Sequence, residues 1–144
     1  MKVLTRGEYS CLALIELTRS FHKKIPVKIR EIAQKNKIPA KYLVQILLQL
    51  KEAGYVTSQR GKEGGYLLAR PPNKIRLGEV IKRMEGPFVP LPCLGGNGCI
   101  RQRGCGLKPV WNEVDKAISN VIDNLTFEEL ARQSDRIKDI TYNI

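Results

Sequence analysis

The sequence contains few of the residues that catalytic sites and membrane spans require. Its 144 residues include one histidine, one tryptophan and two methionines, and they contain no uninterrupted apolar run of ~18 residues. His22 lies in a basic stretch and cannot complete a Ser-His-Asp set, and the glycines of residues 61–65 do not form a phosphate-binding motif. Residues 1–8 lack the apolar stretch of a secretion signal. We therefore expect a cytoplasmic protein that is not an enzyme, takes no small-molecule substrate and does not enter a membrane.

Acidic residues are scarce in the first half of the chain. Residues 1–72 hold 14 Lys and Arg against 5 Asp and Glu (+9), whereas residues 73–144 hold 11 against 9 (+2). A surplus of positive charge suits nucleic acid, an anionic membrane or simple solubility, so the charge alone does not choose among them. The local pattern of residues has to decide.

Cysteine is also scarce, but three of the four cysteines are clustered. Cys93, Cys99 and Cys105 stand at equal five-residue gaps within residues 86–108, a segment with six glycines, three prolines and no periodicity. In a reducing cytoplasm such a cluster is more often a ligand set than a disulfide framework. Zinc usually takes a close cysteine pair or a nearby histidine, and neither is present. Cys11 lies on the apolar face of a predicted helix and is expected to be a small core residue.

Two predicted helices open the chain. Thr5 and Glu8 resemble a capping box, and the apolar spacing behind them predicts a helix over residues 6–21. A short second helix has the apolar stripe Ile29, Ile32 and Ala33. Asn36 is predicted to turn the corner after it, because asparagine tolerates the left-handed conformation.

A third predicted helix and a hairpin follow. Pro39 suits the first turn of the helix and Gly54 ends it. Its core face consists of Leu43, Ile46, Leu47 and Leu50. Residues 55–60 and 66–70 read as two short strands around a glycine-rich turn. This is the order of a winged helix-turn-helix, in which the third helix enters the major groove of DNA and the hairpin forms the wing.

The remaining chain predicts a fourth helix, the cysteine segment, and a helix with a wide apolar face. The apolar residues of that face recur at gaps of three and four from Val110 to Leu125, and such a face is commonly covered by a second copy of the same helix. Thr126 with Glu129 predicts the start of a short last helix, with a mobile tail from Gln133. The predicted fold is mainly α with a small β-wing: residues 1–85 as a winged helix-turn-helix DNA-binding domain, 86–108 as a cysteine loop, and 109–144 as a dimerisation helix and tail.

The chain resembles the Rrf2 family of winged-helix regulators, and within it the branch that regulates iron-sulfur cluster assembly. The similarity runs from Leu4 to about Leu130. Its most specific parts are Lys41-Tyr42-Leu43 with Gln45, Arg60-Gly61 with Gly64 to Leu68, Gly78 to Ile81, and the cysteine triplet. The resemblance implies a homodimer with crossed long helices, binding to double-stranded promoter DNA, and an iron-sulfur cluster on the three cysteines, 2Fe-2S ahead of 4Fe-4S.

The fourth ligand of that cluster departs from the family pattern. In the cluster-assembly branch a histidine stands three residues after the last cysteine, but this chain has Lys108 there. The nitric-oxide-sensing branch of the family uses an acidic residue near position 8, given by the partner subunit. The resemblance therefore implies Glu8 as the fourth ligand, although the capping box with Thr5 explains Glu8 without any metal.

Polar residues on the third helix and the wing form the expected DNA-binding set, although a solvated surface is the simpler explanation of charged residues. Glutamine pairs with adenine, an arginine in a wing can enter the minor groove, and an apolar side chain can meet a thymine methyl. The set is Lys28, Lys41, Tyr42, Val44, Gln45, Arg60 and Lys62. Lys28, Lys62, Arg30, Lys35 and Lys37 are expected to contact phosphates.

These observations predict a DNA-binding transcriptional regulator that senses an iron-sulfur cluster, acting as a repressor of cluster-assembly genes. The alternative is a repressor of the same fold that responds to thiol redox state, zinc or nitric oxide, or a cluster-free repressor of sulfur metabolism.

Overall fold

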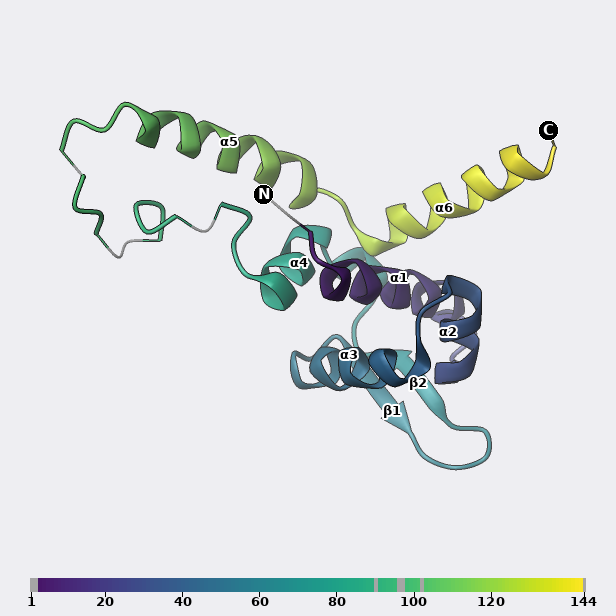
Figure 1. Cartoon of the computed structure of the whole chain (residues 1–144). Helices are drawn as coiled ribbons and strands as arrows, with labels where there is room; N and C mark the ends of the chain where they lie inside the picture. Colours follow the sequence, from purple (N-terminus) through teal and green to yellow (C-terminus); the bar gives the residue numbers. More distant parts are fainter. Residues whose placement is uncertain (1–2, 90, 96–97, 102, 144) are drawn as a thin grey trace.

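The computed structural model describes residues 3–89, 91–95, 98–101 and 103–143, and Figure 1 shows their arrangement. The described chain is mainly helical with a small antiparallel sheet, as predicted. In chain order the elements are α1 (Thr5–Ser20), α2 (Ile29–Asn36), α3 (Ala40–Glu52), β1 (Val56–Gln59), β2 (Gly65–Leu68), the short 3-10 helix η1 (Pro72–Lys74), α4 (Leu77–Glu85), α5 (Leu107–Ile122) and α6 (Phe127–Tyr142). None of these helices combines the length and the apolar character that a membrane span needs.

The core surrounds α1, which packs against α3, α4 and α6. All four residues predicted for the inner face of α3 are at most 1% exposed. Phe127, the first residue of α6, is fully buried with them, and its backbone N–H donates to the carbonyl of Ile75 at 3.0 Å. Burying a leucine or phenylalanine side chain contributes about 1.5–3 kcal/mol. The buried cluster therefore fixes the orientation of α3, the predicted recognition helix.

The predicted capping box at the start of α1 is wrong. Leu4 is the extended residue that precedes the helix, and Thr5 is already helical, with no side-chain hydrogen bond capping this end in the described structure. Glu8 is exposed, and its backbone N–H donates to the Leu4 carbonyl at 3.1 Å. The capping explanation for Glu8 is therefore lost.

The corner between α2 and α3 also differs from the prediction. The left-handed residue is Lys37 (φ 52°), whereas Asn36 is the last residue of α2 and donates its side-chain amide to the carbonyl of Ile32 at 3.0 Å. The corner brings Ile38 into the core, where it is 3% exposed. Burial of Ile38 offsets the cost of a left-handed lysine, about 1–2 kcal/mol.

The wing forms as predicted and is tied to the body. β1 pairs antiparallel with β2 from Val56 opposite Leu68 to Gln59 opposite Gly65. Val27, in the α1–α2 connection, exchanges two backbone hydrogen bonds with Tyr66, of 2.9 and 2.8 Å. A Cβ at Gly65 would lie 2.5 Å from the Val27 carbonyl oxygen, so this close approach requires glycine.

In Figure 1, α5 and the cysteine loop extend to one side of this body, whereas α6 starts in the core against α1 and its C-terminal end extends on the other side. Thr126 and Glu129 form the predicted capping box at the start of α6. Hydrogen bonding to Thr126 holds the pKa of the Glu129 carboxyl below its usual value. The predicted short helix with a tail from Gln133 is wrong, because α6 continues to Tyr142.

Candidate DNA-binding surface and cluster site

The exposed face of α3 carries most of the predicted DNA-binding residues. Lys41 and Gln45 are exposed, whereas Val44 is half-buried on one flank of the helix. Tyr42 is 42% exposed on the other flank, where its ring packs edge-on against Tyr9 of α1 with centroids 5.8 Å apart. The core thus presents these side chains from a fixed helix, as a recognition helix requires.

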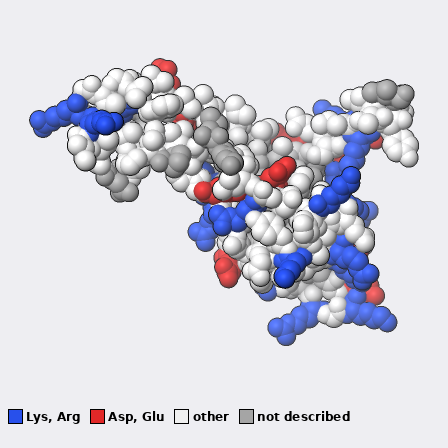
Figure 2. Space-filling model, in the orientation of Figure 1, with Lys and Arg blue, Asp and Glu red and all other residues white. Residues whose placement is uncertain are grey.

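The wing brings a second group of positive charges to the same end of the molecule. Arg60 and Lys62 are exposed in the turn between β1 and β2, and Lys28 is exposed just before α2. Figure 2 shows Lys and Arg side chains gathered at the end of the molecule where this hairpin lies. Lys51 of α3 donates to Ser58 Oγ of β1 at 2.7 Å, which links helix and wing. A basic surface of this kind suits the phosphate backbone of DNA.

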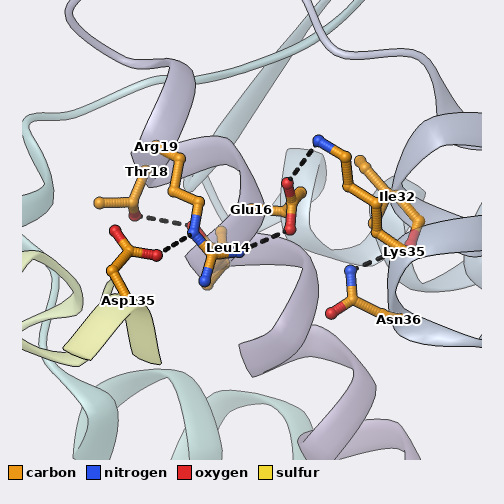
Figure 3. Close-up of polar contacts among 8 residues, drawn as sticks. All are labelled: Leu14, Glu16, Thr18, Arg19, Ile32, Lys35, Asn36 and Asp135. Carbon is orange, nitrogen blue, oxygen red and sulfur yellow. Dashed lines mark hydrogen bonds and ion pairs between the residues drawn. The ribbon is translucent and has the colours of Figure 1, made fainter. Parts of the chain in front are cut away.

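One of the predicted phosphate contacts has a partner within the protein. Figure 3 shows Lys35 of α2 reaching Glu16 of α1, a carboxylate only 4% exposed, with Nζ and Oε1 3.0 Å apart. Arg19 donates to the other oxygen of Glu16 at 2.8 Å and also binds Asp135 of α6 at 2.9 Å. These contacts join three helices around one buried charge. The sequence pattern gives one indication of this buried carboxylate, because Glu16 lies between Leu14 and Leu17 on the buried stripe of α1.

Replacing Glu16 by glutamine should lower the free energy of unfolding by about 1–3 kcal/mol, because the amide offers one neutral acceptor and turns an N–H group toward either Arg19 or Lys35, each of which now donates to a carboxylate oxygen. Urea unfolding followed by circular dichroism measures this change. The matched control is Glu128→Gln, which removes a more exposed pair with Arg132 at 3.4 Å and should cost at most about 0.5 kcal/mol. Equal losses in the two variants would contradict a special role for the buried carboxylate.

The three clustered cysteines border one small cavity. Cys93, Cys99 and Cys105 line a space of about 170 Å³, together with Lys108 and Trp111 at the start of α5. The backbone N–H of Arg101 donates to Cys99 Sγ at 3.5 Å. Three soft sulfur donors around one cavity fit an iron-sulfur cluster by ligand type.

The described side chains do not, however, form a closed ligand set. Among residues 3–89, 91–95, 98–101 and 103–143, no three His, Cys, Asp or Glu side chains are grouped closely enough to hold a metal ion. Glu8 is exposed on α1 and is not among the residues that border the cysteine cavity. Among the described residues, the three predicted sulfur ligands therefore border one cavity without forming a metal-sized group, and the predicted fourth ligand does not border that cavity.

The start of α1 is connected to the root of the cysteine loop by a different acidic residue, which sequence reasoning missed. Glu85 ends α4, immediately before the loop, and accepts a hydrogen bond of 2.5 Å from the backbone N–H of Gly7. Burial, and after it the charges of Glu8 and Glu85, raises the pKa of the nearby Cys11 thiol to about 12. Cys11 therefore stays protonated near neutral pH and is a packing residue, as predicted.

The apolar face of α5 is not buried by any of the residues that the structure describes. Every residue of α5 is described and none is buried, with Val110 48%, Trp111 36% and Val121 62% exposed. An exposed apolar stripe of this length on a helix indicates a contact with another molecule.

Comparison with known proteins agrees with this architecture. Residues 3–133 match the family model Rrf2, described as an iron-dependent transcriptional regulator. The regulator CymR of Bacillus subtilis is 34% identical, with 94% of this chain and 93% of that protein covered, and NsrR of Bacillus licheniformis is 34% identical, with 96% and 97% covered. The solved structure of B. subtilis CymR, described as the global cysteine regulator of that organism, has a TM-score of 0.80 at 32% identity and covers 92% of this chain and 98% of that one. The structure of T. potens IscR has a TM-score of 0.77 at 32% identity, with 93% and 88% covered. The chain belongs to the Rrf2 family of winged-helix transcriptional regulators.

Proposed function

We propose that this regulator is a homodimer whose affinity for promoter DNA depends on an iron-sulfur cluster held by Cys93, Cys99 and Cys105, and that it represses genes of cluster assembly. The single observation that carries the proposal is the cavity that all three cysteines border. A 2Fe-2S cluster is favoured over 4Fe-4S. When bound, such a cluster would make the protein responsive to oxidants and to iron supply, because oxidation or loss of iron destroys the cluster. Because its task is to bind promoter DNA, the protein would act in the cytoplasm.

The division of labour follows the three segments of the chain. Residues 1–85 would bind DNA. Lys41, Tyr42, Val44 and Gln45 would face the bases, Arg60 of the wing would enter the minor groove, and Lys28 and Lys62 would contact the phosphate backbone of DNA. Residues 86–108 would hold the cluster, and residues 109–144 would hold the dimer. Lys108 borders the cysteine cavity, but a protonated ammonium cannot act as a ligand.

The fourth ligand would be Glu8 of the partner subunit. Two features of the structure support this choice: Glu8 is exposed, and it does not form the predicted capping box with Thr5. A ligand from the partner would tie the cluster to α1, which packs against α3. The cysteine loop would then set the position of the recognition helix. Half-sites one DNA turn apart are separated by ~34 Å, so a small displacement of one recognition helix would move it out of register with its half-site.

The alternative is a repressor of the same fold that responds to thiol redox state, zinc or nitric oxide, or a cluster-free repressor of sulfur metabolism. The structural similarity to CymR supports it, since that protein is described as a global cysteine regulator.

Purification without oxygen, followed by visible spectroscopy and analysis of iron, sulfide and zinc, distinguishes these functions. We expect a coloured protein with iron and acid-labile sulfide in equal amounts, and emission from the single Trp111 that rises when the cluster is removed, because Trp111 borders the cysteine cavity. Glu8→Ala should shorten the lifetime of the cluster in air, with the exposed Glu52→Ala as control. A colourless zinc protein would overturn the proposal, and an unchanged lifetime would exclude Glu8.

A further inference from the structure

The recognition helix carries an exposed leucine that the core does not use. Leu48 is 44% exposed, although its neighbours Leu47 and Leu50 are fully buried. It is absent from the described core cluster and from the apolar residues packed against that cluster. Single exposed leucines are common on proteins, so exposure alone does not assign a function.

The position of Leu48 on the helix is what gives it meaning. The stripe directly opposite the buried face of α3 consists of Lys41, Gln45, Leu48 and Glu52, all exposed. Their spacing of four, three and four residues places them on one line along the helix. Leu48 is therefore an apolar side chain in the middle of a polar surface, beside the two residues best suited to contact bases and phosphates.

Val44, the apolar residue expected to meet DNA, occupies a different place. It is half-buried and shares its flank of the helix with Lys51, seven residues later, whose ammonium binds Ser58 of the wing. Leu48 projects from the centre of the face instead. It lies eight residues after Ala40, about 12 Å along the axis, which is comparable to the width of the major groove.

We propose that Leu48 reads thymine, by packing its side chain against the C5-methyl group of one thymine in each half-site. This inference rests on the proposed DNA-binding role of α3 and adds a base-reading residue to it. The occupant is DNA and not a protein, because Leu48 shares its stripe with Lys41 and Gln45 and lies in the half of the chain that holds 14 Lys and Arg against 5 Asp and Glu. The thymine methyl is the apolar group that the major groove offers. The fixed backbone around Leu47 and Leu50 holds Leu48 in place for this contact.

The test uses the full-length protein and DNA duplexes enriched from a random library by binding to it. Uracil then replaces thymine at each half-site position, which removes only the methyl group. Wild-type protein should lose about fourfold in affinity at one position per half-site, and about 15-fold when both half-sites are changed. Leu48→Ala should bind the thymine and uracil duplexes equally, and Leu48→Met should keep most of the difference. Ile137→Ala, which shortens a similarly exposed side chain on α6, should behave as wild type.

The outcomes separate DNA binding by this chain from thymine reading by Leu48. If no duplex is enriched, DNA binding by this chain and the inference both fail. If duplexes are enriched but wild type never distinguishes thymine from uracil, or Leu48→Ala still does, the inference fails and the DNA-binding function stands. The wild-type comparison alone can overturn the inference, so it does not depend on the folding of any variant.

Discussion

Val121→Asp in α5 should convert the dimer into a monomer and weaken binding to a two-half-site operator by at least about 100-fold. Val121 is 62% exposed in the single chain, so the substitution leaves the core of the protomer intact. In the proposed dimer the same position is covered by the partner helix. A carboxylate buried there without a partner costs several kcal/mol. A monomer contacts one half-site at a time and loses the effective concentration that links two binding units, which is worth 10²–10⁴ in affinity.

Sedimentation velocity and fluorescence anisotropy with operator DNA measure the two effects. The matched control is Asn120→Asp, which adds the same charge to the adjacent exposed residue, off the apolar stripe. It should leave both mass and affinity unchanged. A Val121→Asp protein that sediments as a dimer with full affinity would show that α5 does not form the interface.

Serine at Cys93, Cys99 or Cys105 should abolish stable cluster binding. Each of these cysteines borders the same cavity, and serine is a far weaker ligand for iron because its hydroxyl is harder and less acidic than a thiol. Iron, sulfide and visible absorption should fall to background in protein purified without oxygen. Emission of Trp111 should match that of cluster-free wild type.

Cys11→Ser provides the internal control for this series. Burial and the neighbouring carboxylates hold the pKa of the Cys11 thiol at about 12, so Cys11 offers no thiolate near neutral pH. The variant should keep full iron and sulfide. If one loop cysteine can be replaced without loss of the cluster, or if Cys11→Ser loses it, the ligand assignment is wrong.

The helical body was predictable because its pattern is set by burial. The inner face of α3 recurs with helical spacing, and every residue in it is buried. The wing was predictable for a similar reason, since short strands around Gly61, Gly64 and Gly65 can form little else. The same capping pattern was correct at Thr126 and wrong at Thr5, where the helix begins one residue earlier in register. Sequence spacing does not determine which residue is the last extended one.

The candidate site was predictable only in part, because its tertiary partners are distant in the sequence. Nothing local to Lys35 indicates that its ammonium lies 3.0 Å from Glu16, nineteen residues earlier. The hydrogen bond between Glu85 and Gly7 spans 78 residues and joins the root of the cysteine loop to the segment that carries Glu8. The spacing of the cysteines predicts that three thiolates bind one metal centre, and in the structure they border one cavity without forming a metal-sized group among the described residues. The proposed fourth ligand and the proposed partner of α5 belong to a second subunit, so the fold of a single chain does not test either of them.

The link between the cluster and DNA affinity is central to the proposed function. The most direct measurement is the operator dissociation constant, at one salt concentration, of wild type with the cluster intact, of wild type after its removal, and of the Cys99→Ser protein. The proposed coupling predicts that the intact form differs from the other two by about 5–150-fold, and that these two agree with each other. Identical affinities in all three forms would show that the cysteine loop does not regulate DNA binding.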